Sequence, residues 1–263
     1  MTRRFQFQTL PVFGGDQRQV AEVVRGVMNG KTNNTGEITL ATGNATTTTL
    51  YDERIGYDSL IFFVPVSSAA MEDSAPYGAF QDTTDQTITA NTATAMTLNT
   101  TDYSNGVYVS NSSRMNVRNY GIYNLQWSGQ FQNTDTQLHD VSVWIRKNGT
   151  DVAGSAGFIS IPNSHGGVDG HVVVGWNYFV ELAANDYVEL YWSATNAAIS
   201  LQYYPTQTSP TRPSTASLIA TLNYVAPAAT SNVYVSARQQ GQATITHWAN
   251  ATADKTYGYI VVG

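Results

Sequence analysis

The chain has 263 residues, enough for one large domain or two modest domains with a substantial core. Only 12% of its residues are charged, about half the usual ~25%, so its solubility must depend on abundant Thr, Asn, Ser and Gln side chains. The net charge of −6 argues against a nucleic-acid surface, and the lack of cysteine excludes disulfides, thiolate catalysis and cysteine-ligated zinc.

Residues 1–13 are expected to form an arm or a short strand, because apolar residues alternate weakly around Phe5 and Phe7. The stretch has two arginines but lacks the apolar core of a signal peptide, so we expect the protein to be made in the cytoplasm. No run in the chain approaches the ~18 apolar residues of a membrane span, and we expect no membrane insertion.

One helix is predicted soon after the arm. Asp16 is its expected N-cap and Gly30 its expected stop. Valine is a mediocre helix former, so packing rather than intrinsic propensity must hold this helix. Its single apolar stripe predicts that it docks against another surface. The stripe has the spacing i, i+3, i+4 and i+7, at Val20, Val23, Val24 and Val27.

From residue 36 onward the pattern predicts strands. Residues 37–41 and 46–51 flank a TGNA turn and are expected to form a hairpin. Residues 59–66 form a continuous apolar run, SLIFFVPV, which is typical of a buried strand. Residues 67–76 break the pattern and are predicted to be a linker.

The centre of the chain is predicted to contain many short strands and no helix, which is typical of a β-sandwich or jelly roll. Its Thr-rich part could be disordered, but an alternating apolar side with Ile88, Ala90, Met96 and Leu98 favours a strand. A second linker is expected near residues 226–231. The predicted strands are 77–81, 87–98, 106–117, 121–132, 140–147, 155–161, 171–182, 187–194, 199–204 and 216–225, then 232–238, 242–248 and 256–262.

Residues 171–194 are predicted to form an aromatic-rich hairpin. Residues 183–186 supply the small and polar side chains of a turn, and alternation continues on both sides of it. Because Phe179, Tyr187 and Tyr191 lie on the opposite faces, we expect the hairpin to be covered on more than one side. The predicted apolar faces are Trp176, Tyr178, Val180 and Leu182 before the turn, and Val188, Leu190, Trp192 and Ala194 after it.

The sequence offers little for catalysis or metal binding. His139-Asp140 is the nearest approach to a metal or acid–base pair, and a hydrogen bond at a loop edge is the simpler interpretation. Glu181 and Glu189 are predicted to face each other across the hairpin, on an exposed edge rather than in the groove that glycoside hydrolysis needs; calcium binding is the weaker alternative. His247 is expected to make a structural contact. We therefore predict a non-enzymatic protein without cofactor or metal.

Two separated stretches resemble the halves of a small β-domain that is common in bacteriophage structural proteins. They are residues 46–66 and 233–263, and in that domain the second stretch normally follows soon after the first. The resemblance implies a phage virion protein. The matching residues are Asp52, Arg54, Ile55 and Gly56, then Ser236-Ala237-Arg238, then Thr246-His247, Asn250, Asp254, Thr256 and Gly263.

The residues between these halves resemble the C1q/TNF-like jelly rolls, although the chain has no collagen-like or stalk sequence before them. The first and last strands of such a jelly roll lie side by side, so it can be inserted in a host domain at little loop-closure cost. The resemblance implies a platform (1–74 and 229–263) that carries a jelly-roll head (75–228). The features that match are Gly78-Ala79-Phe80, Gly121-Ile122-Tyr123, residues 143–149, the segment 171–194 and residues 217–224.

Heads of this family form trimers around an axis lined with aromatic and aliphatic side chains. The resemblance implies a homotrimer contact at the surplus aromatic residues, although they could instead fill the core of a monomer. The arm is expected to anchor the trimer by strand addition to the major capsid protein or another virion protein. The trimer candidates are Trp176, Phe179, Tyr187 and Tyr191, and the anchoring candidates are Arg3, Arg4, Phe5 and Phe7.

The leading hypothesis is a capsid decoration protein or head fibre that is made in the host cytoplasm and resides in the virion. The rival is a tail-associated receptor-binding protein, whose tip residues Tyr203, Tyr204 and Arg212 recognise a host surface glycan or protein. A third class, a polysaccharide depolymerase, would need paired acids in a groove, which the sequence does not indicate.

Overall fold

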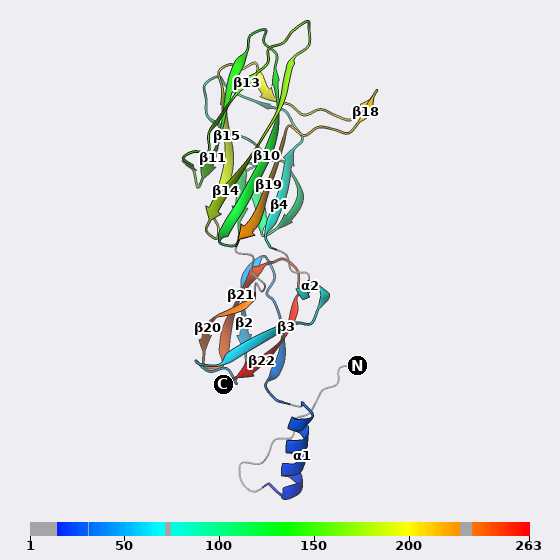
Figure 1. Cartoon of the computed structure of the whole chain (residues 1–263), viewed down its shortest axis with the longest axis vertical. Helices are drawn as coiled ribbons and strands as arrows, with labels where there is room; N and C mark the ends of the chain where they lie inside the picture. Colours follow the sequence, from blue (N-terminus) through cyan, green and yellow to red (C-terminus); the bar gives the residue numbers. More distant parts are fainter. Residues whose placement is uncertain (1–14, 31, 72–74, 227–232) are drawn as a thin grey trace.

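The computed structural model describes residues 15–30, 32–71, 75–226 and 233–263. The molecule is elongated: a larger β unit lies at one end, a smaller β unit in the middle and one helix at the other end (Figure 1). The prediction of a mainly β protein with one short N-terminal helix is confirmed. None of the described helices is long and apolar enough to cross a membrane.

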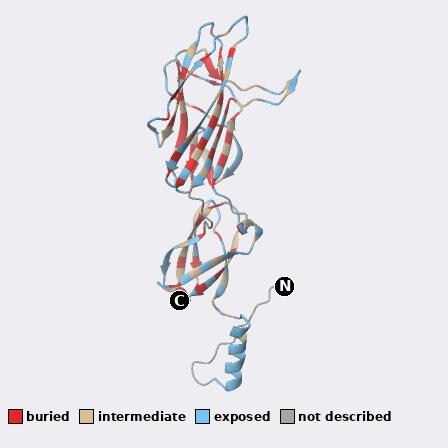
Figure 2. Ribbon diagram, viewed as in Figure 1, coloured by how far each residue is buried: buried red, intermediate tan, exposed pale blue. Residues whose placement is uncertain are grey.

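Helix α1 (Gln17–Met28) begins where the sequence predicts. The Asp16 carboxylate accepts a hydrogen bond from the Gln19 backbone N–H at 2.7 Å, and the Asp16 N–H donates to Gln19 Oε1 at 3.3 Å, which forms a capping box. The C-cap is Asn29, and Gly30 follows with a φ of +73°. No residue of α1 is buried, so the predicted docking of its valine stripe does not occur within the described part of one chain (Figure 2).

The smaller unit, which we call the platform, contains two three-stranded antiparallel sheets. Its elements are β1 (Thr35–Thr39), β2 (Ala45–Tyr51), β3 (Leu60–Pro65), α2 (Ser68–Met71), β20 (Tyr234–Gln239), β21 (Gln242–Asn250) and β22 (Thr256–Val262). One sheet has the order β1-β22-β3 and the other β2-β21-β20. Leu50, Ile55 and Ile245 are among the buried residues of the hydrophobic cluster between them.

Two local predictions for the platform are wrong. The predicted hairpin of residues 37–41 and 46–51 does not form, because β1 pairs with β22 and β2 pairs with β21 in the other sheet. A turn between adjacent sheets uses the same small and polar residues as a hairpin turn, so the local sequence does not distinguish the two. The predicted linker 67–76 contains the short helix α2, whose Ala70 is buried.

Strand β3 is not the buried strand that residues 59–66 predict. It pairs only with β22 and lies at the edge of its sheet. Ile61 and Phe63 pack toward the platform core, whereas Leu60, Phe62 and Val64 point outward and are each more than half exposed. A continuous apolar run therefore marks a strand with two apolar faces, and only one of them is covered here.

The larger unit, which we call the head, contains two facing β-sheets. In one, β4, β19, β10 and β14 lie in that order, with β7 beside β4. In the other, β9, β15, β11 and β13 lie in that order, with β8 beside β9. The strands are β4 (Tyr77–Asp82), β5 (Gln86–Thr87), β6 (Thr94–Ala95), β7 (Thr100–Asn105), β8 (Val107–Ser110), β9 (Arg114–Val117), β10 (Gly121–Asn133), β11 (His139–Lys147), β12 (Thr150–Asp151), β13 (Gly157–Ile161), β14 (Gly170–Leu182), β15 (Tyr187–Ala194), β16 (Ile199–Leu201), β17 (Gln207–Thr208), β18 (Thr211–Arg212) and β19 (Leu218–Ala226).

Four strand pairs of the head are nested along the chain, and each pair is antiparallel. Strand β4 pairs with β19, β9 with β15, β10 with β14, and β11 with β13. Along the chain, the first members of these pairs occur in the order β4, β9, β10 and β11. Their partners follow in the reverse order, β13, β14, β15 and β19. As a result the head begins and ends on neighbouring strands, with Tyr77 opposite Asn223.

The predicted hairpin at residues 171–194 is wrong. Strand β14 pairs with β10 in one sheet, whereas β15 pairs with β11 and β9 in the other, so residues 183–186 cross between the two sheets. The predicted strand at residues 87–98 is also mostly irregular: the two-residue strand β5 overlaps only its first residue, the two-residue strand β6 lies within it, and β7 was not predicted. Its apolar side nevertheless faces the core, since Ile88 and Met96 are buried.

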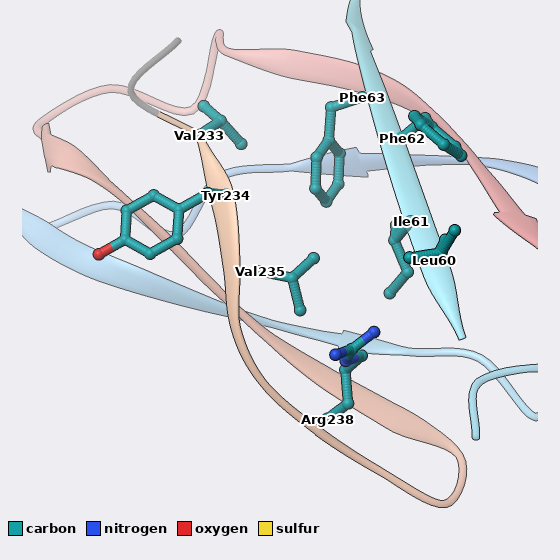
Figure 3. A pocket seen from close by; sticks show the side chains of 8 residues that line it. All are labelled: Leu60, Ile61, Phe62, Phe63, Val233, Tyr234, Val235 and Arg238. Atoms are coloured by element: carbon teal, nitrogen blue, oxygen red, sulfur yellow. The ribbon is translucent and has the colours of Figure 1, made fainter. Parts of the chain in front are cut away.

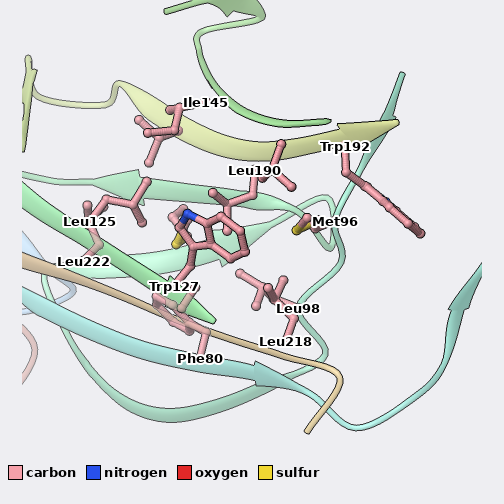
Figure 4. Close-up of a cluster of buried hydrophobic side chains, with 14 of the residues drawn as sticks. Phe80, Met96, Leu98, Leu125, Trp127, Ile145, Leu190, Trp192, Leu218 and Leu222 are labelled. Carbon is pink, nitrogen blue, oxygen red and sulfur yellow. The ribbon is translucent and has the colours of Figure 1, made fainter. Parts of the chain in front are cut away.

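The head core lies between the two sheets (Figures 2 and 4). Phe131 of β10 and Trp192 of β15 are fully buried and meet across the two sheets, with ring centroids 5.8 Å apart. The apolar face predicted for residues 187–194 is confirmed, because Val188, Leu190, Trp192 and Ala194 are all buried. This cluster shares no residue with the platform cluster, and the predicted domain boundaries lie at or beside residues outside the described ranges.

Side-chain contacts among the described residues join the head to the platform. The Asn119 side chain binds two backbone groups of β21: Nδ2 donates to His247 O at 3.4 Å, and Oδ1 accepts from the Ala249 N–H at 3.2 Å. Trp248 of β21 packs edge-on against Tyr224 of β19, with ring centroids 4.7 Å apart. An amide and an aromatic pair thus contribute to the link between the two units.

Candidate interaction surfaces

The outward face of the head sheet β4-β19-β10-β14 is almost free of charge. Alternate side chains on these strands point away from the core, as their burial shows. Of these outward residues, all within the described part of the chain, only Glu181 is an Asp, Glu, Lys or Arg. The middle of the face is built from uncharged polar side chains. They include Asn124, Gln126, Ser128, Gln130, Thr221 and Asn223.

Exposed apolar side chains lie on the same outward face. Phe179 and Val173 of β14 and Ile219 of β19 are 57%, 65% and 46% exposed. Two polar atoms of the face, Asn124 Oδ1 and Thr221 Oγ1, are buried and have no hydrogen-bond partner among the described residues. Burial of this face between copies would desolvate few charges, and each Asn, Gln, Ser or Thr group that loses water there would need a hydrogen-bond partner from the second surface.

The open edge of the sandwich adds further aromatic surface beside this face. Trp176 of β14 reaches across to Gly157 of β13, where a Cβ would lie 2.2 Å from Trp176 Cζ3, so only glycine fits there. Trp176 remains 46% exposed, and Phe158, the next residue of β13, points outward and is 82% exposed. Phe158 was not among the predicted contact residues, although its outward position follows from the alternation of the predicted strand 155–161.

The structure divides the four predicted trimer-contact residues into two pairs. Trp176 and Phe179 lie on β14, at the outward face and edge just described. Tyr187 and Tyr191 lie on β15 in the opposite sheet, and each is half-buried under a guanidinium group. Those groups are Arg114, 4.4 Å from the Tyr187 ring centroid, and Arg146, 3.9 Å from that of Tyr191.

The tip candidates lie beside a hairpin, β17–β18, that projects from the side of the head (Figure 1). Tyr204 packs edge-on against His171 of β14, with the Tyr204 hydroxyl 3.2 Å from His171 Nδ1. The Arg212 guanidinium lies 5.7 Å from the Tyr204 ring centroid. Burial raises the pKa of Tyr204 above its ordinary value. Tyr203 is tied by its N–H to Asp85 Oδ1 at 2.8 Å, so all three candidates are held in place by neighbours.

The platform has an apolar groove between two of its edge strands, β3 and β20 (Figure 3). The groove has a volume of about 340 Å³, and Phe63 and Val235 point into it from opposite sides. Arg238 donates from Nη1 to the Ser59 carbonyl and so bridges β20 to the residue before β3. Neither strand has a partner on its groove side among the described residues, so both edges could accept an added strand.

Several of the residues on which the predicted platform resemblance rests hold the platform together. Asp52 Oδ1 accepts hydrogen bonds from Arg54 Nε at 2.7 Å and from the Arg54 N–H at 3.0 Å, and Asp52 Oδ2 accepts from the Tyr259 hydroxyl at 2.8 Å. The side-chain hydrogen bond from Arg54 lowers the pKa of Asp52 from 3.8 to about 2. His247 is buried with Nε2 2.8 Å from Thr48 Oγ1, which confirms its predicted structural role.

The acidic and histidine candidates are engaged in separate contacts. His139 Nε2 lies 2.7 Å from Asp135 Oδ2 rather than beside Asp140, and this hydrogen bond lowers the pKa of Asp135. The predicted pairing of Glu181 with Glu189 is wrong, because the two strands lie in opposite sheets. Glu181 accepts a hydrogen bond from Tyr120, and Glu189 is buried against Ser113. The described residues contain no group of three or more His, Asp or Glu side chains that could hold a metal ion.

The predicted anchoring residues Arg3, Arg4, Phe5 and Phe7 lie outside the described residues. Comparisons of the chain with known protein families and with curated proteins find no match.

Proposed function

We propose that this chain is a non-enzymatic structural protein of a bacteriophage virion, present as a homotrimer that decorates the capsid or forms a head fibre. The observation that carries the proposal is the outward face of β4-β19-β10-β14. It combines an almost uncharged centre with exposed Phe179, Val173 and Ile219, and beside its edge lie Trp176 and Phe158. A surface with few charges and several exposed aromatic groups suits burial between copies.

The nested strand pairing supports a jelly-roll assignment for the head. In a jelly roll the chain doubles back on itself as one long antiparallel ribbon and is then wrapped into two sheets. First therefore pairs with last, second with second-last, and so on inward, which is the order of the four pairs in the head. Because β4 and β19 are neighbours, insertion of residues 75–228 into a platform of 1–74 and 229–263 would need only short connections.

In this proposal the platform anchors the trimer to the major capsid protein or to another virion protein. The arm residues Arg3, Arg4, Phe5 and Phe7 would add as a strand to a neighbouring capsid edge. Gold-labelled antibody against the head should therefore decorate the capsid of intact particles of the phage that encodes the chain. Label on the tail would favour the second candidate function, and particles without label would refute both.

The second candidate is a tail-associated receptor-binding protein, and the cluster of Tyr204, His171 and Arg212 favours it. An aromatic ring beside a cation and an imidazole is suited to a host glycan or protein surface. Binding of the purified protein to host cells, lost in Tyr204→Ala but kept in Phe158→Ala, would support this role. Absence of any binding would contradict it.

A further inference from the structure

The platform exposes an apolar sheet face that no described residue covers. On the outer side of β1-β22-β3, Ile260 lies opposite Phe62 and Val262 opposite Leu60. Phe62 is 56% exposed, and Figure 3 shows Leu60 and Phe62 on the opposite side of β3 from Phe63, which points to the core. We call the surface formed by Leu60, Phe62, Val64, Ile260 and Val262 the outer platform face.

This face is also hollowed. A shallow depression of about 540 Å³ lies over Gly258, which has no side chain to fill it, and is bordered by Val64, Ile260 and Glu37. Gly258 pairs with Glu37 on one side and Val64 on the other, so the carboxylate and the apolar groups share one face. The outer platform face can therefore receive a ridge of apolar side chains.

Helix α1 provides such a ridge. Val20, Val24 and Val27 lie along one side and are all exposed, and Val24 is 51% exposed. A helix of this length is marginal in water unless its apolar stripe is packed. Arg25 in its last turn lies on the polar side of the helix, away from the valines, so the contact would depend on the apolar stripe alone.

We propose that α1 of one copy packs its valine stripe onto the outer platform face of a second copy. This inference rests on the proposed homo-oligomer and specifies what joins the copies at the platform end. Helix on sheet is a common two-layer arrangement, and here it would cover both uncovered surfaces at once. No other described element of the chain has a free apolar stripe of helical spacing.

The position of α1 favours a second copy over the chain's own platform. The Val261 N–H donates to Asn34 O at 2.8 Å, so the residue before β1 is still hydrogen-bonded to β22. Helix α1 projects beyond the end of the platform (Figure 1), and none of its residues is buried, so its stripe is not packed on the outer platform face of the same chain.

Cysteine cross-linking tests this directly, because the natural chain has no cysteine. Two full-length chains with different tags are co-expressed, one with Val24→Cys and the other with Phe62→Cys, and oxidised under mild conditions. Docking between copies should give a disulfide-linked heterodimer in roughly tenfold excess over controls, because the interface raises the effective concentration of the two thiols. Val27→Cys with Ile260→Cys provides a second, independent pair.

Two matched controls place one cysteine off the proposed contact. Glu22→Cys, on the polar side of α1, is paired with Phe62→Cys, and Val24→Cys is paired with Tyr51→Cys, which is exposed on the other platform sheet. Heterodimer no more abundant than in these controls would overturn the inference. So would an intrachain disulfide in the double variant Val24→Cys/Phe62→Cys, which would place the helix on its own platform. If light scattering still gives a trimer in either case, the proposed homotrimer stands without this contact.

Discussion

Replacement of Asp52 by Asn tests whether the motif residues act as structural links of the platform. Asp52 directly follows β2, and its carboxylate accepts hydrogen bonds from Arg54, two residues further on, and from Tyr259 of β22. It therefore connects the two platform sheets. The substitution removes the negative charge and one acceptor but keeps the side-chain shape. We expect the platform to unfold more easily and the head to be unaffected, because the two cores share no residue.

The magnitude follows from the pKa of Asp52, which is lowered from 3.8 to about 2 in the folded protein. This difference corresponds to at most about 2.4 kcal/mol of folding free energy at neutral pH. The Arg54 side chain is 29% exposed, so solvent screening reduces the expected loss to about 1–2 kcal/mol. Because the folded pKa is the lower one, the contribution is full above pH 3.8 and is lost as the pH falls toward 2.

Scanning calorimetry of the full chain at neutral pH and near pH 2 would measure the effect. At neutral pH Asp52→Asn should lower the unfolding temperature of one transition, while Glu53→Gln, which alters an exposed neighbouring carboxylate, should leave it unchanged. Near pH 2 the Asp52 variant and the natural protein should differ little. An equal difference at both pH values would refute the ionic origin of the stabilisation.

Three further predictions concern the head. Phe131→Ala should lower the free energy of unfolding, measured by urea denaturation, by about 3–5 kcal/mol, because the ring is fully buried against Trp192. A loss below about 1 kcal/mol would contradict this packing of Phe131 in the head core. Phe179→Asp should convert trimers to monomers in sedimentation velocity without changing the circular dichroism, whereas Tyr51→Asp should not. Asn119→Ala should cost about 1–2 kcal/mol and speed limited proteolysis between head and platform; unchanged cleavage would show that the amide does not hold the junction.

Local patterns were sufficient to predict most strands and their inward faces. The alternation before residue 183 and after residue 186 places Val180, Leu182, Leu190 and Trp192 inward, and all four are buried. The N-cap of α1 at Asp16 was likewise predicted and is confirmed. These features depend on neighbours in the sequence, and they were predicted correctly for that reason.

Partners across the sheets were not predictable in the same way. The turn before β15 has hairpin chemistry, yet it joins strands of two different sheets. The apolar run of β3 predicts a strand covered on both sides, whereas Leu60 and Phe62 face outward. The local sequence determines neither the pairing of β14 and β15 nor the side on which β3 is covered, because both depend on which distant strand lies beside each segment.

The same limit applies to the candidate surfaces. Trp176 and Phe179 were singled out from their own strand, but the uncharged face they adjoin is assembled from β4, β10, β14 and β19, which are distant in sequence. Tyr187 and Tyr191 were grouped with them only because a hairpin was assumed. The structure separates the two pairs onto opposite sheets, so a trimer contact through the uncharged face involves the first pair.

We propose that copies of the chain bury the outward face of β4-β19-β10-β14 against one another. Multi-angle light scattering of the purified full-length protein at micromolar concentration would measure the mass of the assembly. A homotrimer should give a species with three times the chain mass of 28.6 kDa. A stable monomer at that concentration would contradict it.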